Sequence, residues 1–355
     1  MDQFLYSIPI LGLVFQVGGY LIDVLPTSAP IILRAATPIA FGALCGVVCE
    51  RSGVVNIGIE GTMLTAAFTG WVVGIAANNL LGPFEPGPLG VTPALLIGLA
   101  GGVLSAVAIS GLHAWMSISL RVDQIISGTI INIAAFGITG YLNNVIAAAS
   151  PVSAGQFEKF TPPEFLTSLP LVGWLFTTIF NQGPITLSLL VFVVGLQVWL
   201  FRSRWGLRTR AVGEHPKAAE TVGIDVIRLR YRNVLIGGAF AGLGGAFLSM
   251  ELSNSFQAGG TAGRGFIALA AMIVGRWTPI GAFGAALLFS LFLTLGQTIT
   301  FVPPTGSLGD IVAAVPPQVF SALPYIVTIV VLAGLIGKST PPAADGKPYE
   351  REATT

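Results

Sequence analysis

The residues best equipped for chemistry in this 355-residue chain lie in the stretch CERSGVVNIGIEGTMLTAAF, residues 49–68. Glu50, Arg51, Asn56 and Glu60 fall within eleven positions there, between long apolar sequences. Carboxylate and amide groups in such surroundings can bind a polar solute, relay a proton, or satisfy backbone groups of a neighbouring helix. A charged side chain at the centre of a bilayer costs about 2.5 to 3.5 kcal/mol unless it is paired or hydrated, so we expect none of these side chains to face lipid.

Catalysis and metal binding find little support in the sequence. His113 and His215 lie on different segments, and no Asp, Glu or Cys cluster has metal-ligand spacing. Cys45 and Cys49 are four residues apart on one helical face, which allows a metal or redox pair but is more typical of small packing residues. The ending of LIGKST is like a nucleotide-binding P-loop, but Leu332 stands where the leading glycine is required. We predict no enzymatic activity, no catalytic residue, and no metal or cofactor bound by this chain.

The composition predicts a polytopic membrane protein. Hydrophobic residues make up 53% of the chain and charged residues 9%, whereas soluble domains are about 25% charged. The net charge of +1 gives no general attraction to nucleic acid. The N-terminal MDQFLYSIPI has no basic residues ahead of its apolar run, so we predict no cleaved signal peptide.

Apolar runs of about 20 residues, the length that crosses roughly 30 Å of hydrocarbon, predict an all-α fold. Nine runs qualify: 4–25, 29–49, 57–78, 93–118, 124–148, 184–201, 231–252, 278–300 and 318–337. A tenth at 265–276 is short and predicts a half-helix or a re-entrant segment, because a broken backbone at membrane depth must be buried in protein or line a cavity. We therefore expect about ten transmembrane helices in a domain of residues 1–337, followed by a polar, disordered tail, 338–355.

The positions of the polar residues along these runs divide them into two groups. Glu50 and Arg51 are expected near a membrane surface, where a salt bridge or a hydrated turn would explain them. Deeper polar and glycine positions either line a solute pathway or satisfy backbone groups of a neighbour, and the sequence leaves both readings open. An interhelical hydrogen bond of this kind is worth about 1 kcal/mol. The candidate pathway residues are Asn56, Gly58, Glu60, Gly61, Thr129 and Asn132.

The loop of about residues 202–232 sets the orientation. It holds eight of the seventeen Lys and Arg residues, which predicts a cytoplasmic location. With ten crossings, both termini are then cytoplasmic.

Within that loop, GEHPKAAETVG, residues 213–223, predicts a short helix of about two turns that begins near Pro216 and stops at Gly223. So short a helix is marginal alone. It needs the ends of its own membrane helices or a separate cytoplasmic protein as a partner. The alternative is a connector that attaches to anionic lipid through its flanking arginines.

Four segments resemble one family of transport proteins. AVGEHPKAAETVGIDV, residues 211–226, resembles the coupling-helix signature of bacterial ABC importer permeases of the ribose and branched-chain amino acid type. ATPIAFGALCGVVCERSGVVNIGIEGTML, residues 36–64, is similar to the subgroup that imports nucleosides with a basic-membrane-protein type of binding lipoprotein. Residues 124–142 and 264–289 also resemble that subgroup. The outward loops 150–183 and 301–317 depart from the family.

The resemblance implies a permease of ten helices with two inverted repeats, spans two to five and seven to ten, and a cytoplasmic coupling helix. Ala218 and Ala219 would approach an ATPase closely, with Glu214 and Lys217 at the rim. The implied coupling residues are Gly213, Glu214, Pro216, Lys217, Ala218, Ala219 and Gly223.

The implied partners are a second, distinct permease, two ATP-binding subunits that carry ATP and Mg²⁺, and an extracytoplasmic solute-binding lipoprotein. The implied location is the bacterial plasma (inner) membrane. Nucleosides are the expected solute, with ribose-like sugars or branched-chain amino acids as alternatives in the same class. An ion-coupled secondary transporter with Glu60 or Glu251 as the relay is a different class of explanation.

Overall fold

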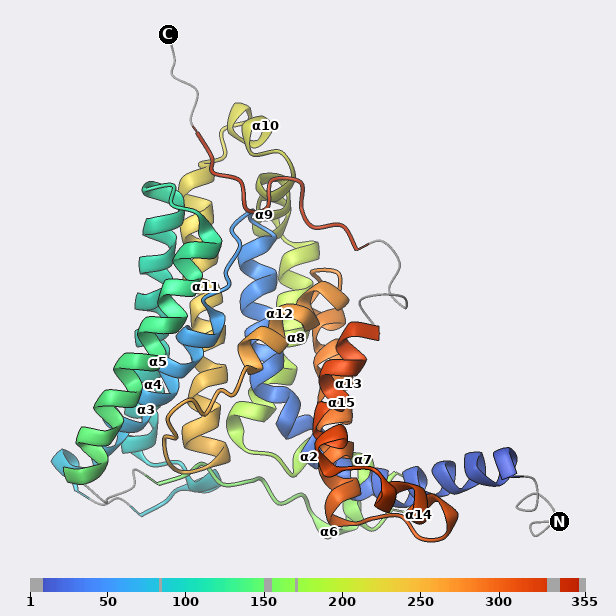
Figure 1. Cartoon of the computed structure of the whole chain (residues 1–355). Coiled ribbons are helices and arrows are strands. Elements are labelled where there is room, and N and C mark those ends of the chain that lie inside the picture. The colour runs from blue at the N-terminus through green and yellow to red at the C-terminus, as the bar shows by residue number, and fades with distance from the viewer. Residues whose placement is uncertain (1–8, 83–84, 150–154, 170–171, 331–338, 351–355) are drawn as a thin grey trace. The chain divides into compact units, whose positions relative to one another are not determined.

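The computed structural model describes residues 9–82, 85–149, 155–169, 172–330 and 339–350, and within these ranges it is helical without strands. The all-α prediction is confirmed for this part of the chain (Figure 1). The helices are α2 (Pro9–Glu50), α3 (Ile59–Leu81), η1 (Pro88–Gly90), α4 (Pro93–Ala114), η2 (Trp115–Ser119), α5 (Gln124–Ala149), α6 (Glu164–Thr167), α7 (Gly173–Phe180), α8 (Pro184–Arg202), α9 (Arg204–Glu214), α10 (Pro216–Thr221), α11 (Val226–Phe247), η3 (Leu248–Leu252), α12 (Arg264–Val274), α13 (Pro279–Phe301), α14 (Ser307–Ala314) and α15 (Pro317–Val330).

The chain divides into two compact units. The first comprises Met1–Ala36, Phe160–Gln182 and Leu287–Ile336. The second comprises Thr37–Lys159, Gly183–Ala286 and Gly337–Thr355. All the candidate pathway and coupling residues belong to the second unit.

Seven helices of the described part are long and apolar enough to cross a membrane: α2 from Phe15, α3, α4 with η2, α5, α8, α11 with η3, and α13. Their lengths and composition indicate a multi-pass membrane protein. One continuous helix, α2, takes the place of the separate predicted runs 4–25 and 29–49, although it contains Pro26 and Pro30. Prolines are tolerated in membrane helices where neighbouring groups satisfy the freed backbone. The predicted run 318–337 matches α15 in part, and its last residues lie outside the described ranges.

The first unit contains much of the two outward loops. The predicted loop 150–183 includes the short helices α6 and α7, and the predicted loop 301–317 includes α14. Side chains fix these segments to the start of α2. The Tyr20 hydroxyl donates to Val302 O at 2.8 Å, and the Gln182 amide donates to Pro30 O at 3.0 Å.

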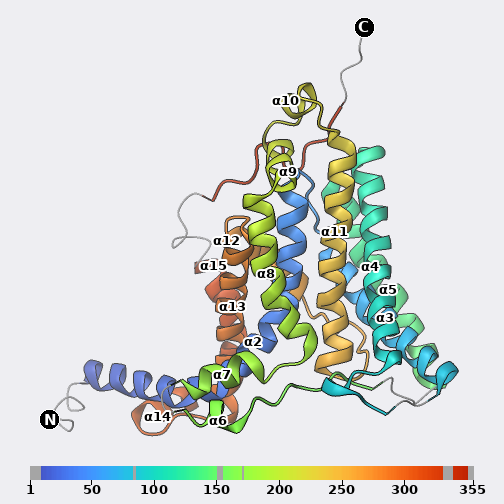
Figure 2. The same ribbon diagram turned by 180° about the vertical axis from the view of Figure 1, so that it is seen from behind.

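The second unit is built around α3, which packs against α4, α5 and α11. Helices α4, α5 and α11 run side by side in both ribbon views (Figures 1 and 2). The backbones of α3 and α4 lie so close that a Cβ added to Gly98 would stand 2.7 Å from Gly70 O. Small residues give this close packing in membranes, where burial of apolar surface adds little. The Thr92 hydroxyl accepts from Leu95 N and caps the start of α4.

Two helices of this unit begin in its interior. Figure 1 shows the segment 51–58 running from the end of α2 to the start of α3 partway along the unit, and the loop 253–263 rising from η3 to the start of α12. Helix α12 has only 11 residues. The short helix predicted at 265–276 is therefore confirmed, and the two interior helix starts meet where most of the candidate pathway residues lie.

Candidate functional site

The non-helical segment 51–58 carries backbone polar groups, at Val55 and Ile57, that are bonded by side chains of other helices. These side chains belong to α4 and α5. The Gln124 carbonyl accepts from Val55 N at 2.7 Å, and His113 Nε2 donates to Val55 O at 3.0 Å. The Asn132 amide donates to Ile57 O at 3.0 Å. Where water is absent, a non-helical backbone needs side chains to bond its N–H and C=O groups. One role of Gln124, His113 and Asn132 is therefore structural.

Asn132 and Gly61 join the start of α3 to α5. The Asn132 carbonyl accepts from Gly61 N at 2.7 Å, so its amide holds both a donor and an acceptor of the helix start. A Cβ on Gly61 would lie 2.8 Å from both Asn132 Cα and Ile131 O. Only glycine at position 61 permits so close an approach of α3 to α5. The Asn132 carboxamide fixes the distance between the two helices through its two hydrogen bonds.

Glu60 caps the start of α12. Its carboxylate accepts from Gly263 N at 2.8 Å and from Gly265 N at 2.6 Å, one oxygen to each. The N-terminus of a helix carries a partial positive charge that favours an anion. Glu60 also lies in the first turn of α3. One carboxylate therefore serves two helix starts that are far apart in the sequence.

A cavity of about 400 Å³ opens beside these groups. Glu60 and Asn132 supply its polar edge, and Phe136 and Phe266 supply aromatic surface. Its lining residues are Glu60, Gly61, Leu64, Asn132, Ile133, Phe136, Gly259, Thr261, Ala262, Gly263 and Phe266.

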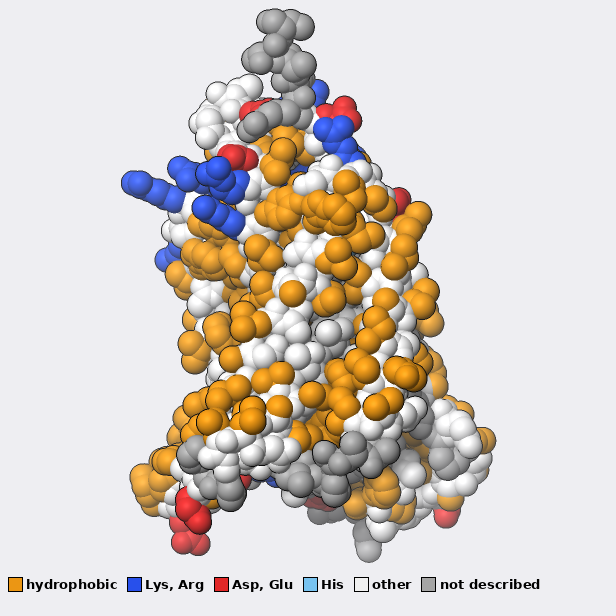
Figure 3. Space-filling model, turned by 90° about the vertical axis from the view of Figure 1, so that its left-hand side faces the viewer, with side chains coloured by type: hydrophobic (Ala, Val, Ile, Leu, Met, Phe, Trp, Pro, Cys, Tyr) orange, Lys and Arg blue, Asp and Glu red, His pale blue; other side chains and the backbone are white. Residues whose placement is uncertain are grey.

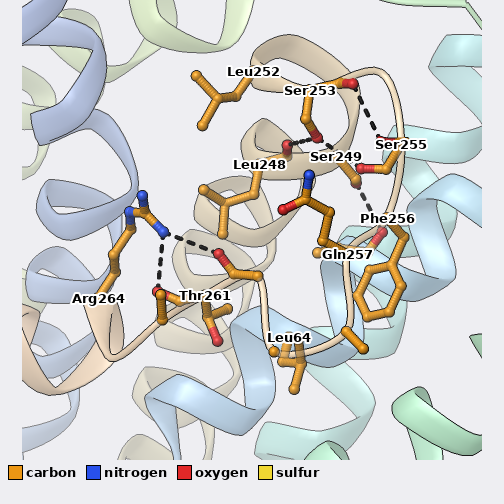
Figure 4. A pocket seen from close by; sticks show the side chains of 15 residues that line it. Leu64, Leu248, Ser249, Leu252, Ser253, Ser255, Phe256, Gln257, Thr261 and Arg264 are labelled. Carbon is orange, nitrogen blue, oxygen red and sulfur yellow. Dashed lines mark hydrogen bonds between the residues drawn. The ribbon is translucent and has the colours of Figure 1, made fainter.

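A second cavity of about 310 Å³ adjoins the first and shares Leu64, Gly259, Thr261 and Ala262 with it. Figure 4 shows the side chains of Ser253, Ser255 and Gln257 gathered on one side of this space and Arg264 on the other. Arg264 donates to Gly260 O at 3.0 Å and to Thr261 O at 3.2 Å, which fixes the loop that separates the two cavities.

The two cavities can hold a small polar molecule that contains a ring. Sites of about 300 to 1,000 Å³ with apolar walls and a few placed polar groups are typical for small ligands. Aromatic faces here suit a flat ring, and amide, hydroxyl and carboxylate groups suit its hydroxyl and amine substituents. The arrangement is suited to binding, with no nucleophile and base brought together among the described lining residues.

The predicted pathway residues divide into three groups. Glu60, Gly61 and Asn132 line the cavity. Asn56 and Gly58 are buried behind it, where the Asn56 carbonyl accepts from Gly58 N at 3.0 Å. Thr129 does not join the site, because its exposed hydroxyl donates to Ile125 O of its own helix.

Sequence reasoning missed the support from Gln124 and His113 and the lining by Phe136 and Gln257. A glutamine at the start of a span and a histidine inside one were usable signals, since both are rare at membrane depth. The lining role of Gln257 had no such signal in a loop rich in glycine and serine.

Replacing Asn132 by alanine is expected to destabilise the second unit around α3. It leaves Gly61 N–H and Ile57 C=O without their partner, at about 1 to 3 kcal/mol for each buried group. We expect the melting temperature of the purified protein in detergent to fall by roughly 4 °C or more. Thr129→Ala, on the same helix, is the matched control and should change it little. Equal melting temperatures for both variants would contradict the role given to Asn132.

The predicted coupling residues lie on α9, α10 and the turns beside them. Pro216 is the first residue of α10, and Gly223 follows the helix with φ of 83°, so both predicted boundaries are confirmed. Lys217 and Ala218 are exposed. Ala219, the other alanine predicted to approach an ATPase, is 4% exposed and packs with Val212, Val226, Leu229 and Tyr349 of this chain.

Residues 339–350, here called the C-terminal segment, are ordered against this region, and the prediction of a disordered tail is wrong for them. Ala344 N donates to Gly213 O at 2.9 Å, and Ala343 N donates to the Glu214 carboxylate at 3.1 Å. Ala344 and Tyr349 are buried. Polar composition favours disorder, but contacts made by a few well-placed residues outweigh it here. A groove of about 980 Å³ remains between α10 and this segment.

Glu50 and Arg51 both bond to residues that follow α12. Glu50 is 5% exposed and accepts from Trp277 Nε1 at 2.6 Å, while Arg51 donates to Trp277 O at 2.8 Å and to Arg276 O at 3.1 Å. They tie the end of α2 to the residues after α12. Burial lowers the pKa of Arg51.

Asp345 of the C-terminal segment lies beside Glu50 and Arg230. Burial raises the pKa of its carboxyl to about 6 from 3.8, and the Glu50 hydrogen bond, Gly346 N–H and Arg230 act against that rise. The docked segment therefore binds a proton more tightly than the free one. Its association is expected to strengthen as pH falls from about 6 to about 4.

Comparison with known proteins gives a consistent result. A family model described as "Branched-chain amino acid transport system / permease component" matches residues 29–332. The chain is 35% identical to the nucleoside ABC transporter permease protein NupC of Lactococcus lactis subsp. cremoris, over 90% of this chain and 95% of that protein. It is 37% identical to the guanosine ABC transporter permease protein NupQ of Bacillus subtilis, over 93% and 98%.

A further relative carries a different solute in its name. The chain is 33% identical to TsgC13 of Haloferax volcanii, provisionally named a glucose ABC transporter permease protein, over 84% of this chain and 88% of that protein. No solved structure matches the chain.

Proposed function

Because the chain belongs to the family of permease components of branched-chain amino acid transport systems, we propose that it is the membrane-spanning subunit of an ATP-driven ABC importer for nucleosides. The relatives named for nucleoside and guanosine transport cover nearly the whole chain at 35% and 37% identity. That match along the full length is the observation that carries the proposal.

The cavity chemistry supports a nucleoside over the alternatives. Phe136 and Phe266 offer faces on which a base can stack. Glu60 and Asn132 offer acceptors and a donor for ribose hydroxyls or ring amines. A simple sugar would leave the aromatic surface unused, and a branched-chain amino acid would need a partner for its ammonium and its carboxylate together.

The two carboxylates that an ion-coupled transporter would need are already occupied as helix caps. Glu60 accepts from two amides at the start of α12. Glu251 is 6% exposed and accepts from Ile185 N at 2.7 Å and from the Thr186 hydroxyl at 2.6 Å, at the start of α8. Carboxylates fixed in this way are better suited to holding helices together than to binding and releasing ions. ATP-driven transport is therefore the better explanation.

The helix order supports the proposed inverted repeats. Within the second unit, α2 ends near α9 and α10, and α11 begins near them and runs the opposite way (Figures 1 and 2). Each is followed by an irregular segment and an interior helix start, at α3 and α12. Opposed repeats of this kind surround the solute site of many transporters.

The charge distribution supports the proposed orientation. On the face shown in Figure 3, Lys and Arg side chains gather at the end that carries α9 and α10. The positive-inside tendency places that end in the cytoplasm. There α10 would meet an ATP-binding subunit, which holds ATP and Mg²⁺. A distinct second permease and an extracytoplasmic solute-binding lipoprotein complete the proposed bacterial plasma-membrane complex.

Uptake by the reconstituted transporter tests this function. Proteoliposomes that contain both permeases and the ATP-binding subunits, with the binding protein on the opposite side from ATP, should accumulate labelled guanosine only when ATP is present. Unlabelled adenosine or uridine should compete, whereas ribose, glucose and leucine should not. Uptake that persists without the ATP-binding subunits and collapses with a protonophore would instead establish an ion-coupled transporter.

A further inference from the structure

The C-terminal segment contacts α10 through Tyr349 and the end of α9 through Ala343 and Ala344. The Tyr349 ring packs with Ala219, Val212, Val226 and Leu229, and its hydroxyl bonds the Glu220 carboxylate. Ala343 and Ala344 hold the last turn of α9, which leads into α10, through Glu214 and Gly213. A helix of six residues is too short to be stable alone, so the segment supplies much of what keeps α10 in place.

The same segment contacts the ends of the helices that surround the cavity. Arg230, near the start of α11 and 1% exposed, donates to Lys347 O at 3.0 Å. The Ser339 hydroxyl donates to Ile273 O at the end of α12, at 3.0 Å. Ala344 O lies against Gly53, just after the end of α2, where a Cβ on Gly53 would stand 3.0 Å from it. The twelve residues of the C-terminal segment thus connect α10 with the ends of α2, α11 and α12. Helix α2 leads through residues 51–58 to the start of α3, and α11 leads through η3 and residues 253–263 to the start of α12.

The contact with Gly213 shows how closely the segment is fitted. A Cβ on Gly213 would collide with Arg51 O, so the last turn of α9 already lies against the residue that follows α2. On the other side of that turn, Gly213 O accepts from Ala344 N. The turn is therefore held between the irregular segment that leads to the site and the C-terminal segment.

We propose that residues 339–350 are a positioning element of the coupling machinery, which holds α10 and transmits its movement to the ends of α2, α11 and α12. This inference rests on the proposed function, because it needs an ATP-binding subunit to move α10. Tyr349 is the positioning residue on the α10 side, and Arg230 receives the segment on the side of the cavity helices.

The complete transporter in proteoliposomes tests the proposal through nucleoside imported per ATP hydrolysed. Tyr349→Ala should lower that ratio at least tenfold while ATP hydrolysis continues. Tyr349→Phe, which keeps the ring and loses the hydroxyl, should stay within threefold of the unmodified ratio. Glu350→Gln is the matched control, because its ion pair with Arg121 at 2.7 Å is largely exposed and such pairs contribute little.

Amide hydrogen exchange of α10 in the purified permease provides a second, independent readout. Tyr349→Ala should raise the exchange rate of residues 217–222 at least tenfold, and Glu350→Gln should not. An unmodified transporter without ATP-dependent uptake would contradict the proposed function alone. Unchanged α10 exchange in Tyr349→Ala, or an unchanged import ratio in a working transporter, would overturn the positioning role.

Discussion

Replacing Glu60 by glutamine is expected to reduce ATP-dependent uptake by about one to two orders of magnitude. The Glu60 carboxylate accepts from Gly263 N and Gly265 N with one oxygen each. Glutamine keeps only one acceptor oxygen, and its NH₂ group would face an N–H donor at the other position. Hydrogen bonds to charged groups contribute about 1.5 to 3 kcal/mol, and about 1.4 kcal/mol corresponds to a factor of ten. Initial rates of guanosine uptake, normalised to permease abundance, measure the effect.

Two further variants make the Glu60 result specific. Glu85→Gln removes an exposed carboxylate in the loop after α3 and should leave uptake unchanged. Gly265→Ala leaves Glu60 in place but puts a Cβ 2.6 Å from Glu60 Cα, so it should impair uptake by the same route. If Glu60→Gln transports like the unmodified protein at equal abundance, Glu60 neither orders α12 in the working cycle nor belongs to the site.

Placing a tryptophan at Ala218 is expected to lower copurification of the ATP-binding subunit at least tenfold without reducing the amount of folded permease. Ala218 is exposed on α10, beside Lys217, and its side chain points away from the cluster that contains Ala219. Added bulk there enlarges the surface that a partner must accommodate, and the groove of about 980 Å³ that Ala218 lines has room for the larger side chain. Affinity purification of a tagged permease, with quantification of the bound subunit, measures the effect.

The neighbouring position should behave differently. Ala219→Trp forces a large side chain into a cluster with Val212, Val226, Leu229 and Tyr349, and overpacking of this kind costs about 1 to 3 kcal/mol. It should therefore lower permease stability first. Leu80→Trp, at an exposed position of α3 far from α10 in the sequence, controls for an added tryptophan. Normal copurification with Ala218→Trp would show that α10 is not a docking element.

The fold could be predicted to the extent that it depends on local apolar length. The short run at 265–276 was too short for a span, and it is the 11-residue helix α12. By contrast, the sequence predicted two runs, 4–25 and 29–49, where α2 is one continuous helix that contains Pro26 and Pro30. Whether a proline ends a membrane helix depends on which neighbours satisfy the freed carbonyls, and those neighbours come from distant parts of the chain.

The site could be predicted where polarity was unusual for its surroundings. Glu60 and Asn132 were identified because an apolar helix has little other use for them, and both line the cavity. Thr129 met the same criterion, but a threonine hydroxyl can bond its own helix and so needs no pathway. The C-terminal segment shows the opposite error. Its composition indicated disorder, whereas Tyr349 and Ala344 fit a surface that only the folded α9, α10 and α11 create.

The bond between Glu60 and α12 also constrains how the protein is made. Glu60 leaves the ribosome 203 residues before Gly263, the first amide that it binds. Helix α3 must therefore enter the bilayer with a carboxylate whose final partner does not yet exist, so the nascent chain has to keep water or the insertion machinery beside it. Once α12 is in place, Gly263 N and Gly265 N bind the Glu60 carboxylate and replace that temporary partner. The binding site is consequently completed only after α12 has been made, and a chain truncated before Gly263 leaves the Glu60 carboxylate without these partners.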